Sequence, residues 1–90
     1  MLIMTAPVVL MYMTTWCPYC TRARALLKHK HVVFTEIDID AVPDQKAIMM
    51  QKSGRRTVPQ IFIDERPIGG CDDLYTLEQR GELDTLLADH

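Results

Sequence analysis

Apolar and polar positions divide the first part of the chain into a strand, a helix and a second strand. Residues 8–12 form a continuously apolar run, which predicts a short strand covered on both faces. Residues 21–30 follow a helical pattern, and Pro18 fits in the first turn, where its missing N–H costs nothing. The apolar side of this helix carries Cys20, Ala23, Leu26 and Leu27. Residues 33–40 alternate between two faces and predict a second strand.

A second helix and a hairpin are predicted next. Pro43 or Asp44 opens this helix, and Gly54 is placed to end it. The helix carries Ala47 and Met50. Residues 60–63 predict a third strand, and an acidic turn leads into a short fourth strand at residues 67–69. The two strands are expected to pair as an antiparallel hairpin, because only a short turn joins them.

The C-terminal part predicts one more helix and a final helical turn. The Gly69-Gly70 pair interrupts the strand pattern, and Asp72 or Asp73 is expected to cap the helix that follows. The inner face of this helix includes Leu74 and Leu77. After Gly81, the apolar positions of the last turn are Leu83, Leu86 and Leu87.

The predicted order is therefore βαβαββα, an α/β fold. The first two strands are expected to be parallel, joined through the first helix, and the hairpin extends the same sheet. This gives a four-stranded mixed sheet flanked by helices. Residues 8–90 are expected to form a single domain, and residues 1–7 a flexible N-terminal tail.

Composition narrows the function classes. Of the 90 residues, 48% are hydrophobic and 24% charged, and the formal net charge is −2. Basic residues are scattered among acids, which argues against nucleic-acid binding. The one local excess, Lys52 with Arg55 and Arg56, fits either a solvated loop or an anion contact. No apolar stretch approaches the roughly 20 residues that span a bilayer, and residues 1–7 are too short for a signal peptide.

Cysteine usage argues against a structural role for the thiols. Three cysteines, an odd number, do not suit a secreted disulfide framework. Structural zinc usually takes four ligands, and His29, His31 and His90 lack zinc-finger spacing relative to the cysteines. No metal is expected.

The segment Cys17-Pro18-Tyr19-Cys20 carries the candidate chemistry. It follows the first strand directly and opens the first helix. A helix N-terminus has unpaired N–H groups and a partial positive charge, so it favours a thiolate over a thiol. The spacing therefore predicts a redox-active dithiol with Cys17 as the nucleophile. Cys20, one turn along, is expected to be more buried.

Three motifs in order resemble the dithiol glutaredoxins. They are the Cys-Pro-Tyr-Cys segment 17–20, the segment 56–63 around Thr-Val-Pro, and the Ile-Gly-Gly-Cys-Asp-Asp-Leu segment 68–74. The resemblance covers residues 8–87, nearly the whole chain. It implies a thioredoxin fold and glutathione-dependent thiol–disulfide exchange. It also implies a cis peptide between Val58 and Pro59, which leaves the Val58 backbone beside the cysteines.

The resemblance further implies a glutathione site. The backbone amides of Cys71 and Asp72 are expected to hold the γ-glutamyl carboxylate, and the Asp72 carboxylate is expected to hold the ammonium. Simple N-capping is the alternative for the aspartates. The other implied glutathione-binding residues are Tyr19, Arg56, Thr57, Val58, Pro59, Gly70 and Asp73. Where the family commonly has a lysine, three residues before the first active cysteine, this chain has Thr14. Arg56, with Lys46 as a second candidate, is expected to take over that contact.

The sequence thus predicts an enzyme that reduces protein disulfides and glutathione mixed disulfides through Cys17 and Cys20, with glutathione as co-substrate. Two alternatives remain open: an electron donor recharged by thioredoxin reductase, and an iron–sulfur carrier that bridges two subunits through Cys17 and glutathione. The expected partners are glutathione and disulfide-containing or glutathionylated proteins, ribonucleotide reductase among the candidates. A cytoplasmic monomer is expected, without nucleic-acid or membrane partners.

Overall fold

The computed structural model describes residues 7–88, so residues 1–6 of the predicted tail and residues 89–90 lie outside it. Pro7, the last residue assigned to that tail, is buried. In chain order the elements are β1 (Val9–Met13), α1 (Pro18–His29), β2 (Phe34–Asp38), α2 (Pro43–Ser53), β3 (Gln60–Ile63), β4 (Arg66–Gly69), α3 (Cys71–Gln79) and α4 (Leu83–Leu87). No helix among them is long and apolar enough to cross a membrane.

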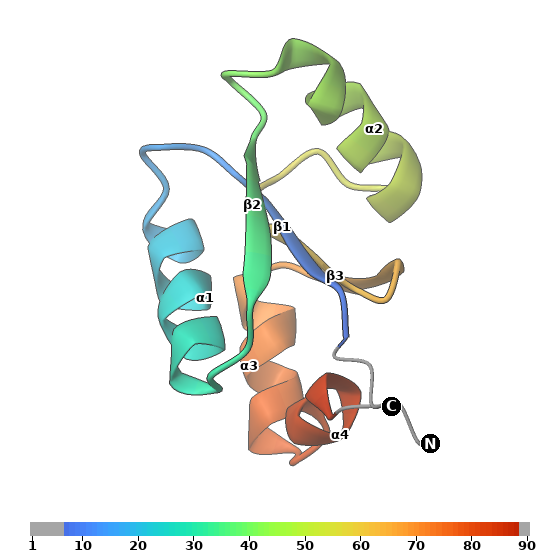
Figure 1. The fold of residues 1–90 in the computed structure, drawn as a ribbon. Helices are drawn as coiled ribbons and strands as arrows, with labels where there is room; N and C mark the ends of the chain where they lie inside the picture. Colours follow the sequence, from blue (N-terminus) through green and yellow to red (C-terminus); the bar gives the residue numbers. More distant parts are fainter. Residues whose placement is uncertain (1–6, 89–90) are drawn as a thin grey trace, which may run out of the picture.

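The four strands form one mixed sheet in the order β2-β1-β3-β4 (Figure 1). β1 pairs with β2 in parallel, from Val9 opposite Phe34 to Met13 opposite Asp38. β3 pairs antiparallel with β1 and with β4, so the two central strands are β1 and β3. The predicted four-stranded mixed sheet flanked by helices is confirmed.

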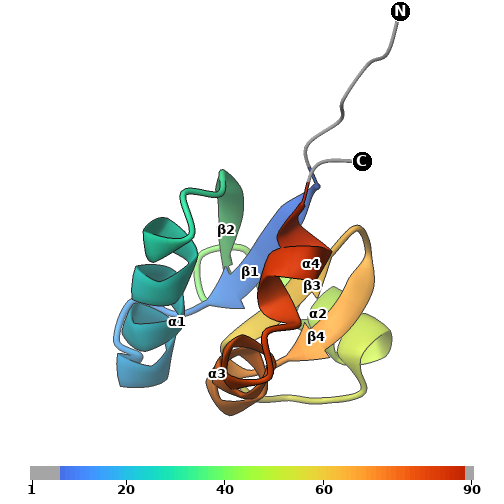
Figure 2. The same cartoon turned by 90° about the horizontal axis from the view of Figure 1, so that it is seen from below.

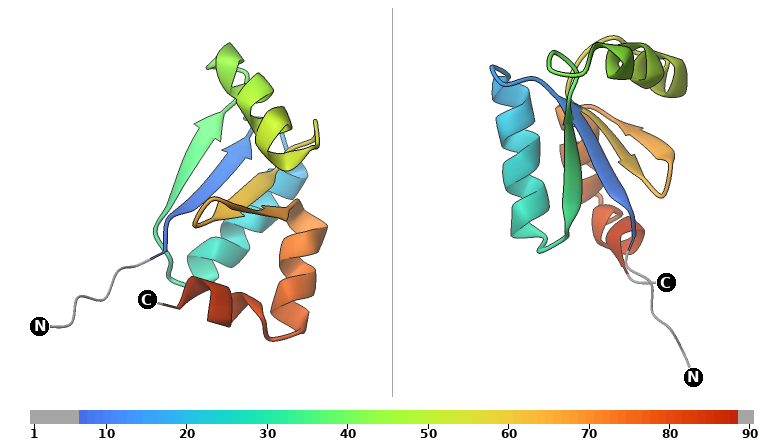
Figure 3. Two further views of the ribbon diagram at one scale, coloured as in Figure 1. Left: turned by 90° about the vertical axis from the view of Figure 1, so that its right-hand side faces the viewer. Right: turned by 45° about the horizontal axis from the view of Figure 1, so that its top comes forward.

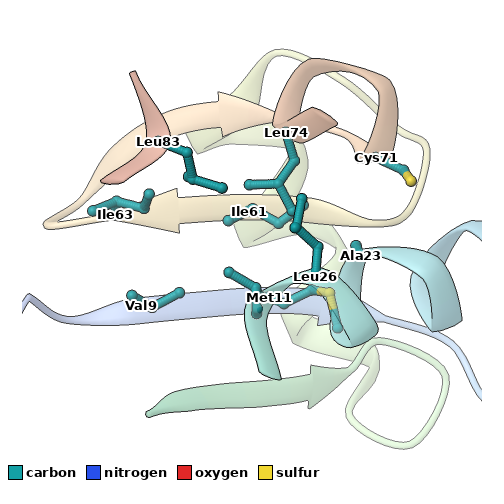
Figure 4. Packing of buried hydrophobic residues seen from close by; sticks show 10 residues of the cluster. Val9, Met11, Ala23, Leu26, Ile61, Ile63, Cys71, Leu74 and Leu83 are labelled. Atoms are coloured by element: carbon teal, nitrogen blue, oxygen red, sulfur yellow. The ribbon is translucent and has the colours of Figure 1, made fainter. Parts of the chain in front are cut away.

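The helices cover the two faces of the sheet unequally. α1, α3 and α4 lie on one face and α2 on the other (Figures 2 and 3). On the first face, the larger core joins the inner sides of these three helices to β1 and β3 (Figure 4). All four apolar residues predicted for the inner side of α1 are buried, which confirms the helical spacing: Cys20, Ala23, Leu26 and Leu27.

The smaller core lies under α2. Met49 packs there with Tyr12, Ile39 and Phe62, and the Tyr12 and Phe62 rings meet edge to face at 5.7 Å. Met49 is the buried residue of α2, whereas Ala47 is exposed and Met50 is 37% exposed. α2 thus contributes one fully buried side chain, which suits a short helix that covers only part of a narrow sheet.

The strand directions bring three distant segments to one edge of the sheet. β1 ends at Met13, and β3, which runs the opposite way, begins beside it, with Tyr12 opposite Gln60. β4 runs opposite to β3, so its last residue, Gly69, pairs with Ile61 at the same edge. The segments 14–17, 57–59 and 70–72 therefore meet there, although they are far apart in sequence.

Candidate active site

Cys17 is the N-cap of α1. Its Sγ accepts a hydrogen bond from the backbone N–H of Cys20 at 3.1 Å. The helix has no acidic residue in its first turn that would oppose a negative charge on the sulfur. The Cys20 amide and the positive end of the twelve-residue helix both face the sulfur, where they stabilise negative charge that develops on it. The side chain is partly exposed, so the sulfur is open to attack a disulfide.

The segment before β3 lies against this sulfur. The Sγ of Cys17 is 3.8 Å from the carbonyl oxygen of Val58. The peptide between Val58 and Pro59 is cis, which confirms the implication of the family resemblance. The two residues come from opposite parts of the chain, and the antiparallel pairing of β1 with β3 brings them together.

Cys20 has a different environment from Cys17. Its side chain is fully buried on the inner face of α1. Burial, followed by the hydrogen bond with Cys17, raises the pKa of Cys20 to about 12. Cys20 is therefore a neutral thiol at neutral pH, and Cys17 is the more accessible thiol of the pair.

An open groove of about 310 Å³ begins at Val58 and extends toward α3. Its lining comes from the first turn of α1, the segment before β3 and the start of α3. The lining residues are Tyr19, Arg55, Thr57, Val58, Pro59, Gly70, Cys71, Asp72 and Asp73. All of these except Arg55 were predicted as glutathione-binding residues from the sequence. The structure thus brings together the predicted residues of three separate motifs.

The basic residue of the groove is Arg55, not Arg56. The guanidinium Nη1 of Arg55 lies 2.8 Å from Oδ2 of Asp73. Arg56 is exposed and is not part of the lining, and Lys46 is also exposed and outside it. The attraction of Asp73 accounts for the choice between the two neighbouring arginines. Sequence spacing gave no sign of this ion pair, because its partners are eighteen residues apart.

Asp73 also closes the N-terminus of α3. Gly70 is the N-cap, and its backbone N–H donates to Oδ2 of Asp73 at 2.9 Å. The prediction that Asp72 or Asp73 would be the cap residue is therefore wrong: the helix starts earlier, and Asp73 acts from within the first turn. The Gly70 N–H and the Arg55 guanidinium hold the pKa of the Asp73 carboxyl below its usual range.

Two glycines leave room for this arrangement. Gly69 has φ +114°, and a Cβ there would collide with the Asp73 carboxylate. A Cβ on Gly70 would lie 3.3 Å from the carbonyl oxygen of Pro59. Gly69 thus leaves room for the Asp73 carboxylate, and Gly70 lets the start of α3 approach the segment before β3 closely.

Comparison with known proteins identifies the family. The glutaredoxin family model matches residues 9–68, which is more than half of the chain. Glutaredoxin 3 of Escherichia coli K12 is 57% identical over 76 residues, covering 84% of this chain and 92% of that protein. The chain belongs to the glutaredoxin family. Glutaredoxins are thiol oxidoreductases, which agrees with the environment of Cys17 described above.

Solved structures confirm that this glutaredoxin has a thioredoxin fold. The solution structure of glutaredoxin from Brucella melitensis superposes with a TM-score of 0.82 at 51% identity, covering 93% of this chain and 91% of that one. The crystal structure of a buckwheat glutaredoxin–glutathione complex superposes with a TM-score of 0.83 at 31% identity, covering 90% of this chain and 76% of that one.

Asp72 and Cys71 complete the groove of this glutaredoxin. Asp72 is exposed, and its carboxylate has no hydrogen-bond or ion-pair partner within residues 7–88. The Cys71 side chain, in contrast, packs in the larger core (Figure 4). Burial raises the pKa of its thiol. Cys71 therefore offers mainly backbone to the groove, while Asp72 offers a free charge.

We expect Asp73→Asn to destabilise the fold by about 1 kcal/mol at neutral pH, through weaker contacts with Gly70 and Arg55. Because the folded pKa of Asp73 is lowered, its stabilisation is present above the ordinary pKa and is lost as the pH falls through the folded value. The difference between wild type and variant, measured by urea unfolding, should therefore shrink in acid. Asp72→Asn, a neighbour without these contacts, is the matched control and should change stability little.

Proposed function

We propose that this glutaredoxin is a glutathione-dependent thiol–disulfide oxidoreductase that reduces glutathione mixed disulfides and protein disulfides. The observation that carries the proposal is the position of Cys17. Its sulfur caps a helix, accepts a hydrogen bond from the Cys20 amide and lies beside a groove lined by one arginine and a free carboxylate. A tripeptide with two carboxylates and one ammonium group suits such a groove.

The reaction has two exchanges. The Cys17 thiolate attacks the glutathione sulfur of a mixed disulfide; a Cys17–glutathione disulfide forms, and the substrate leaves as a thiolate that takes up a proton. A second glutathione thiolate then attacks the glutathione sulfur on Cys17. Oxidised glutathione leaves, and the Cys17 thiolate is regenerated. Stabilisation of that thiolate by the helix N-terminus makes Cys17 a better leaving group in this step.

A disulfide within a protein substrate needs Cys20. Attack by Cys17 gives a mixed disulfide with the substrate and frees one substrate thiol. Cys20 then loses its proton and attacks Cys17, the second substrate thiol leaves, and a Cys17–Cys20 disulfide remains. Two glutathione molecules reduce this disulfide and are oxidised. The raised pKa of Cys20 keeps it protonated until this step.

Glutathione recognition is assigned to the groove walls. We assign the γ-glutamyl carboxylate to the backbone amides of Cys71 and Asp72, because they lie in the groove at the N-terminus of α3. We assign the ammonium to the free Asp72 carboxylate. Arg55 is the candidate for the glycine carboxylate, in the role first assigned to Arg56, because it lines the groove. The remaining contacts are assigned to Tyr19, Thr57, Val58, Pro59, Gly70 and Asp73. The buckwheat relative solved with glutathione supports glutathione as the ligand.

We expect Asp72→Ala to raise the KM for glutathione about three- to tenfold, as for the loss of one charge-assisted hydrogen bond in an exposed site. The rate of Cys17 alkylation should stay near the wild-type value, because Asp72 makes no contact with the sulfur. Steady-state kinetics with varied glutathione measure the first effect. Glu82→Ala, which removes an exposed acid outside the groove, is the control. An unchanged KM in Asp72→Ala would place the γ-glutamyl group elsewhere.

The proposal is tested by coupling the chain to glutathione, glutathione reductase and NADPH and by following NADPH oxidation with a small glutathione mixed disulfide. Turnover is expected with this system. Turnover only when thioredoxin reductase replaces glutathione and its reductase would contradict the proposal. The proposed partners are glutathione and proteins with disulfides or glutathionylated cysteines, ribonucleotide reductase among the candidates. The proposed location is the cytoplasm, where thiols are kept reduced.

A further inference from the structure

Two exposed apolar residues lie in the loops at the Cys17 end of the sheet, outside the groove. Trp16, directly before the nucleophile, is 94% exposed, and Val42, in the β2–α2 loop, is 47% exposed. Single exposed apolar residues are common, but a tryptophan is usually largely buried. The core packing of the fold makes no use of the Trp16 side chain.

Asp38, at the end of β2, connects the two loops that carry these residues. Its Oδ2 accepts from the hydroxyl of Thr15 at 3.2 Å, next to Trp16. Its Oδ1 accepts from the backbone N–H of Asp40 at 2.9 Å, and its backbone carbonyl accepts from the N–H of Val42 at 3.1 Å. Both loops follow parallel strands and lie at the same end of the sheet (Figures 1 and 3). The two loops are therefore held to each other before any partner binds.

The strand order separates Trp16 and Val42 from the groove. The order is β2-β1-β3-β4, and Cys17 follows β1. The groove is built on the β3 and β4 side, from the segments before β3 and after β4. Trp16 and Val42 belong to the loops after β1 and β2, on the other side. A protein segment that carries the target cysteine can thus extend from Cys17 toward β2 while glutathione occupies the groove.

The β2 side is also acidic. Asp40 and Asp44 are exposed and flank Val42, and neither carboxylate has an ion-pair partner in the part of the chain that the structure describes. Glu36, in contrast, is neutralised by Arg24 at 2.7 Å. An apolar surface with two free carboxylates suits a partner segment that carries apolar and basic side chains.

We propose that Trp16, Val42, Asp40 and Asp44 form a docking surface for the protein segment around the target cysteine, and that this surface selects targets with apolar and basic residues next to that cysteine. The inference rests on the proposed function, because it names a substrate class for the same nucleophile. Trp16 supplies most of the contact area and the two aspartates supply the preference for basic residues.

The test uses two synthetic glutathionylated peptides of equal length, one with Leu and Lys beside the cysteine and the other with Ser and Glu. A small mixed disulfide of glutathione and cysteine is the third substrate. The wild-type chain should show a kcat/KM about tenfold higher for the Leu/Lys peptide than for the Ser/Glu peptide. Trp16→Ala should remove most of this preference, and Trp16→Phe should keep much of it. Turnover of the small substrate should be the same in all three proteins.

Val33→Ser is the matched control. Val33 is 89% exposed, but it precedes β2 and so lies at the opposite edge of the sheet from Cys17. It should change none of the three rates. Equal kcat/KM for both peptides in the wild type would overturn the docking surface and leave the proposed function intact. An equal loss on all three substrates in Trp16→Ala would also overturn it, since Trp16 would then act on Cys17 itself. No turnover of any substrate by the wild type would instead overturn the proposed function.

Discussion

Cys17→Ser is expected to abolish turnover of every disulfide substrate. A serine hydroxyl stays protonated at neutral pH and cannot form or leave a disulfide, so neither exchange can begin. The fold should survive, because the side chain is partly exposed and the hydroxyl can still accept the Cys20 N–H as a helix cap. NADPH oxidation in the glutathione reductase assay should fall to the rate without the protein.

Cys71→Ala is the matched control for that loss. This substitution also removes one thiol but keeps the backbone amide that lines the groove. The side chain of Cys71 packs in the core. Most of the activity should remain, with a modest loss of stability from the cavity. Substantial turnover by Cys17→Ser would contradict the assignment of the nucleophile.

Cys20→Ser is expected to separate the reduction of glutathione mixed disulfides from the reduction of protein disulfides. Reduction of glutathione mixed disulfides should continue near the wild-type rate, because that cycle uses only Cys17 and a second glutathione. Reduction of a disulfide within a protein should fall to background, because the variant lacks Cys20, the thiol that releases the substrate from Cys17. Parallel assays with a small mixed disulfide and with an insulin-type protein disulfide measure both effects.

The buried position of Cys20 requires a check on folding in this experiment. A serine there places a hydroxyl in an apolar environment, so some loss of stability is expected, and Cys20→Ala serves as the second variant. Both variants should separate the activities in the same way. Loss of both activities in two folded variants would mean that Cys20 takes part in the first exchange as well. Full protein-disulfide activity would mean that the resolving thiol lies elsewhere.

The fold follows from the sequence because its signals are local. The helical spacing of the buried face of α1, Pro43 at the start of α2 and Gly54 after its end each depend on neighbouring residues. The alternation in residues 33–40 predicted the face of Ile37 and Ile39, which pack in the core under α2, Ile39 just after the end of β2. Val33 and Thr35, on the same face of the pattern, are exposed. The observed strand ends differ from the predicted ends by one or two residues, because hydrogen bonds to neighbouring strands decide where pairing stops.

The details of the site depended on contacts between distant segments. The motifs predicted which loops meet, but the choice of Arg55 over Arg56 comes from an ion pair with Asp73. The same aspartate closes the helix that begins at Cys71, although the sequence suggested a cap at Asp72 or Asp73. Trp16 was part of no motif used to predict the site, and its role as a candidate contact emerged only from its exposure and from the strand order.

The most direct test of the account is to map where glutathione attaches. The Cys20→Ala variant is incubated with oxidised glutathione at neutral pH, and the adduct is located by proteolysis and mass spectrometry. The account predicts one glutathione per chain, on Cys17, with the buried thiol of Cys71 unmodified. An adduct on Cys71 instead, or no adduct on Cys17, would contradict the assignment of Cys17 as the nucleophile beside a glutathione groove.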